Sequence, residues 1–277
     1  MKIVTVQFQY PDFYDFTLLC DVFKKSCEIQ MPDVEFVDIH IPPPVKIPGK
    51  ARNFKYNSTK LEIWRDYMQT ATEPIIFADC DMLCMMPAHS AFDIDFDVAF
   101  TARTRVHRIP MNGGIVFANP TAGARIFFDK WLEANNKMLK DEKLHHIWRA
   151  RYAGMNQAAF GYVYHELYLK KKINLKLHEY KTIDWNAVDC DWQNVNGKTH
   201  FVHYKSRLRK FVLREQPVQH PYEIVMNAWY DVKQILYPNG RRPPTVVNNG
   251  DIEHFTGDLV HKRRNYRAKA GTRRIRR

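Results

Sequence analysis

The chain has 277 residues, of which 45% are apolar and 26% are charged, and this is the composition of a globular protein with one large domain or two small ones. The aromatic share of 13% excludes a disordered or fibrous chain, and no apolar run reaches the roughly 18 residues of a membrane helix. The five cysteines form no Cys-x-x-Cys pair and no secretory signal is evident. We therefore expect reduced thiols, no zinc knuckle and a cytoplasmic protein, in the host cell if the protein is viral.

The net charge of +12 is concentrated at the end of the sequence. Residues 259–277 contain nine Lys or Arg and no acid, whereas residues 1–258 carry a net charge of +3. Such a block is typical of an arm that binds nucleic acid or another anionic surface, and a solvated terminus that aids solubility has the same composition. The sequence thus predicts a main domain over 1–215, a helical appendage over 216–258 and a basic tail over 259–277.

The first part of the chain alternates between strand and helix patterns. Strands are predicted over 2–9 and 34–41 with a helix over 15–30 between them, which is the βαβ order of a parallel sheet. A proline-rich loop follows, and then a helix over 59–71 for which Ser58 or Thr59 is a suitable N-cap. The apolar run 74–78 predicts a short buried strand.

The later elements continue this alternation. They are strands over 97–102, 113–119 and 199–204, and helices over about 121–140, 154–170 and 222–236, with a turn-rich stretch from about 182 to 210. The pattern predicts an α/β fold, a mostly parallel mixed sheet flanked by helices, with a C-terminal helical and basic extension. Ligands of such sheets bind beyond the carboxyl ends of the strands, so the residues that follow the strand 74–78 are of special interest.

Asp79 and Asp81 come directly after this predicted buried strand. In an extended segment residues i and i+2 project to the same side, and two carboxylates placed there need a cation. Mg²⁺ and Mn²⁺ prefer such oxygen ligands. Asp-x-Asp also occurs within 93–97 and at 189–191, where a solvated turn explains it equally well. The context of a helix, a proline and an apolar strand favours the first pair as the metal site.

Three more patterns carry polar groups that suit the same site. His203 ends the predicted strand 199–204, where it is a suitable third ligand for Mn²⁺ with His200 as its competitor, and basic residues follow it. The glycine pair at 113–114 precedes an apolar strand, where it either lets a ligand approach the backbone or forms a hairpin turn. Asn156 and Gln157 begin a predicted helix, where their amides can bind sugar hydroxyls or Asn156 can cap the helix.

In their order and spacing these segments resemble a GT-A-fold glycosyltransferase, close to family 8 and related nucleotide-diphosphosugar transferases. The resemblance spans residues 1 to about 210 and is carried by KIVTVQF, KLEIWRDYMQTATEPIIFADCDMLC, FDVAF, MNGGIVFANP, GMNQAAF and FVHYKSRLRK. It implies a Rossmann-like GT-A domain, a nucleotide diphosphate sugar as donor, with a UDP-sugar expected, and Mn²⁺ or Mg²⁺ bound by Asp79, Asp81 and His203. The donor-binding residues that it implies are Gln7, Phe8, Tyr10, Asn57, Lys60, Asn112, Gly113, Gly114, Lys205 and Arg209, with Lys210 as an alternative cation.

Two features depart from the family pattern. Asn156 stands before Gln157 where the family usually has Asp, and the family's Lys-Pro-Trp ending is absent. Because an amide is not a general base, the substitution favours a reaction that retains the anomeric configuration. If the reaction inverts it, Asp184, Asp189 or Asp191 is the candidate base. The catalytic candidates are therefore Asn156, Gln157, Asp189 and Asp191.

The basic charge leads to a hypothesis about the acceptor. A polyanion suits it, and one specific acceptor is a hydroxylated base in DNA, as in some phage enzymes, flipped out and held by Trp185, Trp192 or Tyr204. A glycan or lipopolysaccharide core is the alternative, because its phosphates also attract a basic tail. A third hypothesis is a non-catalytic nucleic-acid-binding module on the same fold. The Asp79 and Asp81 pair argues against this module, because a simple binder needs no clustered carboxylates.

Overall fold

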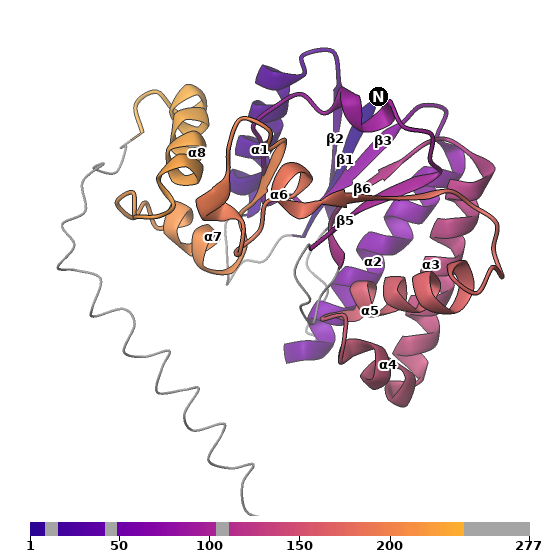
Figure 1. Cartoon of the computed structure of the whole chain (residues 1–277). Coiled ribbons are helices and arrows are strands. Elements are labelled where there is room, and N and C mark those ends of the chain that lie inside the picture. The colour runs from indigo at the N-terminus through magenta and orange to yellow at the C-terminus, as the bar shows by residue number, and fades with distance from the viewer. Residues whose placement is uncertain (9–15, 42–48, 104–110, 241–277) are drawn as a thin grey trace, which may run out of the picture.

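The structure is a computed structural model, and it describes residues 1–8, 16–41, 49–103 and 111–240. A six-stranded sheet of order β2-β1-β3-β6-β5-β7 lies between two layers of helices, and β4 pairs with β8 in a small second sheet (Figure 1). The strands are β1 Lys2–Phe8, β2 Glu35–Ile41, β3 Ile75–Ala78, β4 Met82–Cys84, β5 Val98–Ala102, β6 Met111–Ala118, β7 Leu177–Lys181 and β8 Phe201–His203. The α-helices are α1 Phe16–Gln30, α2 Gly49–Thr70, α3 Ala122–Lys140, α4 Glu142–Arg149, α5 Met155–Tyr162, α6 Thr182–Trp185, α7 Ser206–Leu213 and α8 Glu223–Leu236.

The strand order reverses at β1. β2 and β3 both run parallel to β1 and pair with its two sides, β6 is antiparallel to β3 and β5, and β7 is parallel to β5. The two crossover helices α1 and α2 cover opposite faces of the sheet. This confirms the predicted α/β fold with a mostly parallel mixed sheet. The general rule for such sheets places a ligand crevice at the reversal, between the carboxyl ends of β1 and β3.

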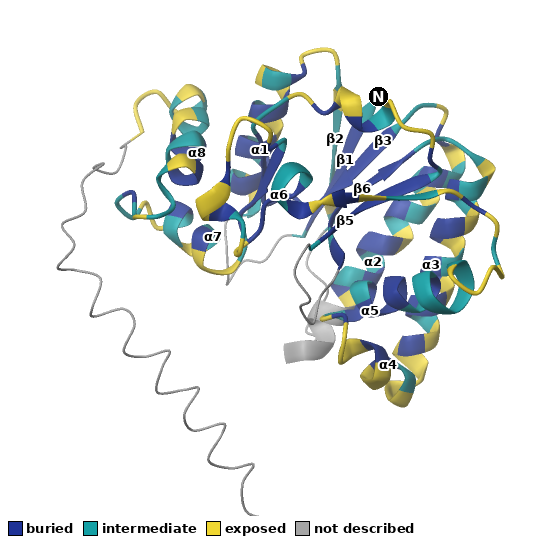
Figure 2. Ribbon diagram, in the orientation of Figure 1, coloured by how far each residue is buried: buried dark blue, intermediate teal, exposed yellow. Residues whose placement is uncertain are grey.

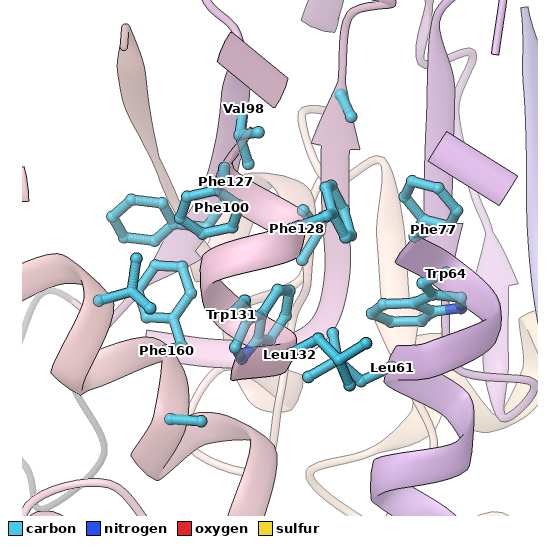
Figure 3. Packing of buried hydrophobic residues seen from close by; sticks show 14 of the residues in the cluster. Leu61, Trp64, Phe77, Val98, Phe100, Phe127, Phe128, Trp131, Leu132 and Phe160 are labelled. Atoms are coloured by element: carbon cyan, nitrogen blue, oxygen red, sulfur yellow. The ribbon is translucent and has the colours of Figure 1, made fainter. Parts of the chain in front are cut away.

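One face of the sheet packs against α2, α3 and α5 through aromatic side chains (Figure 3). Leu61, Trp64 and Met68 of α2 are fully buried, and their helical spacing gives the helix one apolar face. The ring centroid of Trp64 lies 5.3 Å from that of Phe77 in β3 and 6.4 Å from that of Trp131 in α3. This interlocked aromatic layer fixes the position of β3, and with it the position of the residues that follow the strand.

The opposite face carries α1, the small β4–β8 sheet and the C-terminal helices. Val22 of α1, Leu83 of β4 and Trp229 of α8 belong to one buried cluster. Figure 2 shows the buried residues of α1 and α8 in dark blue on the sides that meet. Within the described ranges no helix is both long and apolar enough to cross a membrane. The C-terminal helices are thus part of the layer that covers this face.

The sequence-based boundaries fail in specific places. α2 begins at Gly49, so the prediction that Ser58 or Thr59 caps it is wrong: the buried Ser58 hydroxyl accepts a hydrogen bond of 2.8 Å from the Asn135 amide instead. The helix expected over 154–170 is α5 followed by a π-helical stretch, Val163–Tyr168. Asn156 does not cap it, because the N-cap residue is Gly154 with a φ of 89°. The elements α4, β4, α7 and β7 were not anticipated.

Candidate metal centre

The chain segments that carry Asp79, Asp81 and His203 are joined by backbone hydrogen bonds. The Asp79 amide donates to the Gly114 carbonyl at 2.8 Å, which extends the β3–β6 pairing by one residue. β4 pairs with β8 so that Met82 lies opposite His203, and the Tyr204 amide donates to the Asp81 carbonyl at 2.7 Å. Short strands that are far apart in the sequence therefore set the two carboxylates against the imidazole, beyond the carboxyl end of β3.

These three side chains converge on one point. His203 Nε2 lies 3.1 Å from Asp81 Oδ1 and 3.5 Å from Asp79 Oδ2. One ligand atom from each residue can be chosen so that all three atoms lie within 4.8 Å of one another. Asp81 and His203 are buried, whereas Asp79 is partly exposed. Two carboxylate oxygens and one imidazole nitrogen suit Mn²⁺ or Mg²⁺, and the exposed side leaves access for a further ligand.

His200 is directed away from this point. Its ring stacks on Trp185 with centroids 3.8 Å apart, and its Nδ1 lies 2.7 Å from the Pro87 carbonyl oxygen. Of the two histidines that the sequence left open, the structure therefore places His203 beside the two carboxylates.

Cations neutralise the outer oxygens of both carboxylates. Lys60 Nζ lies 2.5 Å from Asp79 Oδ1, and Arg209 Nη2 lies 3.2 Å from Asp81 Oδ2. Burial by itself opposes ionisation of Asp81, but His203, Arg209 and Lys205 outweigh it and hold the pKa of Asp81 well below its ordinary value. Burial first, and then the nearby Arg103, lower the pKa of Lys205. Asp81 is thus charged at neutral pH.

The glycine pair lies inside β6 and does not form a hairpin turn. A Cβ atom on Gly114 would lie 2.4 Å from His203 Cε1, so the glycine provides the space for this imidazole. The Gly114 amide donates to Asn112 Oδ1 at 2.9 Å, and the Gly113 amide donates to Gln157 Oε1 at 3.2 Å. A further group of polar atoms therefore lies beside His203. It consists of the Asn112 and Gln157 side chains and the backbone amides of the two glycines.

Asn156 and Asn57 connect helices to each other. The Asn156 amide is mostly buried and donates to the Asn57 carbonyl at 2.7 Å. The Asn156 carbonyl accepts a hydrogen bond of 2.8 Å from the Trp131 indole. These bonds tie α5 to α2 and α3, and they place Gln157 against β6.

Asp189 and Asp191 lie on the turn before β8. Arg103, which follows β5, places Nη2 3.2 Å from Asp189 Oδ1. Asp191 Oδ2 accepts a hydrogen bond of 3.4 Å from the Val188 amide. Arg103 was not among the site residues that the sequence predicted.

The ends of β1 and β2 hold further polar groups. Gln7 is buried, and its Nε2 donates to Asp38 Oδ2 at 2.6 Å and lies 3.0 Å from His40 Nε2. Phe8 packs on Tyr56 with ring centroids 4.5 Å apart. Sequence reasoning missed Asp38 and His40, although alternating polar residues at the end of an otherwise apolar strand were a usable signal. Tyr10 and the basic tail 259–277 lie outside the described residues.

Comparisons with known proteins bear on the fold. No protein-family model and no curated protein matches the sequence. The structure is similar to a glycosyltransferase involved in the glycosylation of the major capsid of PBCV-1, with a TM-score of 0.53 and 14% identity over 82% of this chain and 100% of that one. It is also similar to the galactosyltransferase LgtC in complex with donor and acceptor sugar analogs, with a TM-score of 0.52 and 11% identity over 90% of this chain and 98% of LgtC. The chain has the GT-A fold of these glycosyltransferases, as its sequence motifs imply.

Proposed function

We propose that the protein is a metal-dependent glycosyltransferase that moves a sugar from a nucleotide diphosphate sugar, expected to be a UDP-sugar, to an acceptor hydroxyl. The observation that carries the proposal is the convergence of ligand atoms from Asp79, Asp81 and His203 within 4.8 Å of one another, beyond the carboxyl end of β3 in a GT-A sheet. A nucleic-acid-binding module on the same fold has no use for this cluster.

The side chains fit a divalent ion because each carboxylate divides its oxygens between two partners. Asp79 Oδ1 faces Lys60 and Asp81 Oδ2 faces Arg209, while Asp79 Oδ2 and Asp81 Oδ1 face His203 Nε2. The three inward atoms would hold Mn²⁺ or Mg²⁺ while the outer ion pairs remain. When bound, the ion supplies positive charge that stabilises the leaving diphosphate.

Lys205 and Arg209 are the protein's own cations for the leaving group. Both are close enough to Asp81 to lower the pKa of its carboxyl group. Fixed cations in a partly dry site stabilise developing negative charge more strongly than cations in water. Lys60 fixes the Asp79 carboxylate from the opposite side.

We propose that the reaction retains the anomeric configuration. Asn156 stands where the family usually has Asp, and its amide cannot act as a general base, whereas retention requires no strong base. Gln157 and Asn112 would then contact the donor sugar next to the glycine pair. Nuclear magnetic resonance of the product anomer tests this assignment, and an inverted product would overturn it.

The positions of three aromatic side chains bear on which class of acceptor the protein uses. The aromatic residues predicted to hold a flipped base serve the core instead: Tyr204 is fully buried, Trp192 donates to the His203 carbonyl at 3.2 Å, and Trp185 stacks on His200. The hypothesis of a DNA-base acceptor therefore depends on basic charge, chiefly that of the tail 259–277. A carbohydrate acceptor, such as a glycan or a lipopolysaccharide core, needs no such base pocket.

The test is a transfer screen with Mn²⁺. A panel of nucleotide sugars is paired with glycan acceptors and hydroxymethylated duplex DNA, and the mass gain of one sugar is detected by mass spectrometry. Replacing both Asp79 and Asp81 with Asn is expected to abolish metal-dependent turnover and leave the fold intact. The matched control replaces Asp93 and Asp95, an exposed Asp-x-Asp pair away from His203, with Asn and is expected to keep activity. An active Asp79→Asn, Asp81→Asn protein would refute the site.

A further inference from the structure

Arg103 lies at the same edge of the sheet as the metal centre. β6 is antiparallel to both β3 and β5, so β5 runs in the direction of β3 and both strands end at one edge. Asp79 follows β3 directly, and Arg103 follows β5 directly. In the strand order β2 and β1 lie on one side of β3, and β6 and β5 lie on the other. Arg103 is therefore placed beyond the glycine pair of β6, on the side away from β1 and β2.

The chain segment that faces Arg103 also supports β8. The amide of the last residue of β8 donates to the Ala187 carbonyl at 2.9 Å, and Asp189 comes two residues after Ala187. The Asn186 amide donates to the Thr101 hydroxyl at 2.9 Å, and both of these side chains are fully buried. These bonds hold the turn that carries Asp189 against the end of β5, next to the strand that brings the imidazole to the metal centre.

The fold satisfies the guanidinium of Arg103 only in part. Its Nη2 donates to Asp189 Oδ1 at 3.2 Å, and 11% of the Arg103 side chain is exposed, against 53% of the Asp189 side chain. Its Nε is buried and has no hydrogen-bond partner within the described ranges. Native structures pair nearly all buried polar groups, so an arginine kept for stability alone would have its donors satisfied. The position of Arg103 points instead to a ligand.

Lys205 is a second cation beside Arg103. Burial lowers the pKa of Lys205 most, and the charge of Arg103 lowers it further. The carboxylates nearby already have cations of their own, since Asp81 pairs with Arg209 and Asp189 pairs with Arg103. Two neighbouring cations whose nearby carboxylates are shared in this way attract a further anion.

We propose that Arg103 binds a phosphate or carboxylate group of a glycan acceptor and so places the acceptor hydroxyl at the metal centre. The inference rests on the proposed function, in which the donor sugar lies next to the glycine pair of β6. β5 is the next strand, so a group held at its end belongs to the molecule that meets this sugar. A guanidinium suits such an anion because it can donate two parallel hydrogen bonds to its oxygens. Arg103 is then a specificity-determining residue that the metal site does not include.

The experiment compares acceptors that differ in one charged group. The donor is the nucleotide sugar that wild type hydrolyses fastest with Mn²⁺, and the acceptors are neutral oligosaccharides and the same oligosaccharides with a phosphate monoester or a uronic acid. Wild type is expected to show a kcat/KM roughly 10- to 100-fold higher for an anionic acceptor than for its neutral counterpart, because hydrogen bonds between charged groups are the stronger ones. Arg103→Gln is expected to remove this preference.

Two further variants complete the test. Arg103→Lys keeps the charge but not the planar fork, so it is expected to keep part of the preference, and it decides the question if Arg103→Gln fails to fold. Arg65→Gln is the matched control. Arg65 forms an ion pair of 3.0 Å with Asp66, in the half of α2 that leads to the start of β3 and so lies toward the opposite edge of the sheet. This variant is expected to keep the wild-type preference.

The outcomes separate this inference from the proposed function. If wild type hydrolyses a nucleotide sugar with Mn²⁺ but does not prefer anionic oligosaccharides, or if Arg103→Gln keeps the preference, the inference is overturned and the proposed function stands. The same holds if Arg103→Gln slows transfer to neutral and anionic acceptors by one factor, since a purely structural role has that effect.

The remaining outcomes concern the source of the anion. Transfer to hydroxymethylated duplex DNA alone would overturn the assignment of a glycan. A preference for a donor with an acidic sugar, lost in Arg103→Gln, would place the anionic group on the donor and overturn the assignment to the acceptor. If wild type turns over no nucleotide sugar with Mn²⁺, both proposals fail together.

Discussion

Gly114 leaves the space that the His203 imidazole occupies. A Cβ atom at this position would lie 2.4 Å from Cε1 and 2.5 Å from Nδ1 of the ring, so Gly114→Ala forces His203 to turn or β6 to shift. We expect Mn²⁺ affinity to fall by roughly 10- to 100-fold, as it does when a ligand loses its orientation. Calorimetric titration with Mn²⁺ measures the change.

The control for this variant is Gly197→Ala. A Cβ atom on Gly197 has open space around it, so the substitution is expected to leave Mn²⁺ binding unchanged. Equal Mn²⁺ affinity in Gly114→Ala and wild type would show that His203 is not a ligand. The stability of the variant is measured alongside, because overpacking costs about 1–3 kcal/mol.

Single residues also show how far the sequence could predict the site. Asp79 and Asp81 were identified because an apolar strand leads directly into them, and this is a local signal. Arg103 was missed because its ion pair with Asp189 depends on which chain segments lie next to each other in the fold. Ser58 was misread as a cap, since its real partner, Asn135, lies on another helix.

At the scale of elements, the sequence was informative where a strand or helix has its own pattern. β1, β3 and β6 are apolar runs, and α1 and α8 have clear apolar faces, so all five were predicted. β4 and β8 span three residues each, and β4 is strand-like only because β8 pairs with it. These two strands bring His203 to the carboxylates. The two carboxylates could therefore be inferred from the local sequence, whereas the choice between His200 and His203 depends on the pairing of β4 with β8.

The stacking of His200 on Trp185, next to β8, makes the free energy of unfolding depend on pH. Burial lowers the pKa of His200, which lies against Trp185. The unfolded chain takes up a proton at this histidine near its ordinary pKa of about 6.5, while the native state resists it. The stabilising contribution is thus complete above that pH and is lost as the pH falls below it. We expect His200→Phe to lose less stability than wild type between pH 7 and pH 5.5.

Urea unfolding at the two pH values measures this difference. His146→Phe is the control, because His146 is exposed and its substitution leaves the His200 stack intact. This control is expected to follow the wild-type pH dependence. Identical pH dependence in His200→Phe and wild type would mean that His200 titrates alike in the folded and unfolded states.

At the scale of the whole molecule, the C-terminal helices are coupled to the metal centre. The Tyr204 hydroxyl donates to the Val225 carbonyl of α8, and Tyr204 directly follows His203. Leu83 of β4, Tyr204 and Trp229 of α8 share one buried cluster. The segment predicted as an appendage over 216–258 thus supports, through α8, the strands that carry the site.

This coupling predicts a single unfolding transition. Trp229 is fully buried, so Trp229→Ala is expected to lower the free energy of unfolding by about 3–5 kcal/mol, through lost burial and the cavity left behind. Ile235→Ala on the exposed side of the same helix is expected to cost less than about 0.5 kcal/mol. Urea unfolding followed by far-ultraviolet circular dichroism and by tryptophan fluorescence should give coincident curves for both variants. An early separate transition in Trp229→Ala, with Mn²⁺ binding intact beyond it, would show instead that α8 unfolds independently of the metal centre.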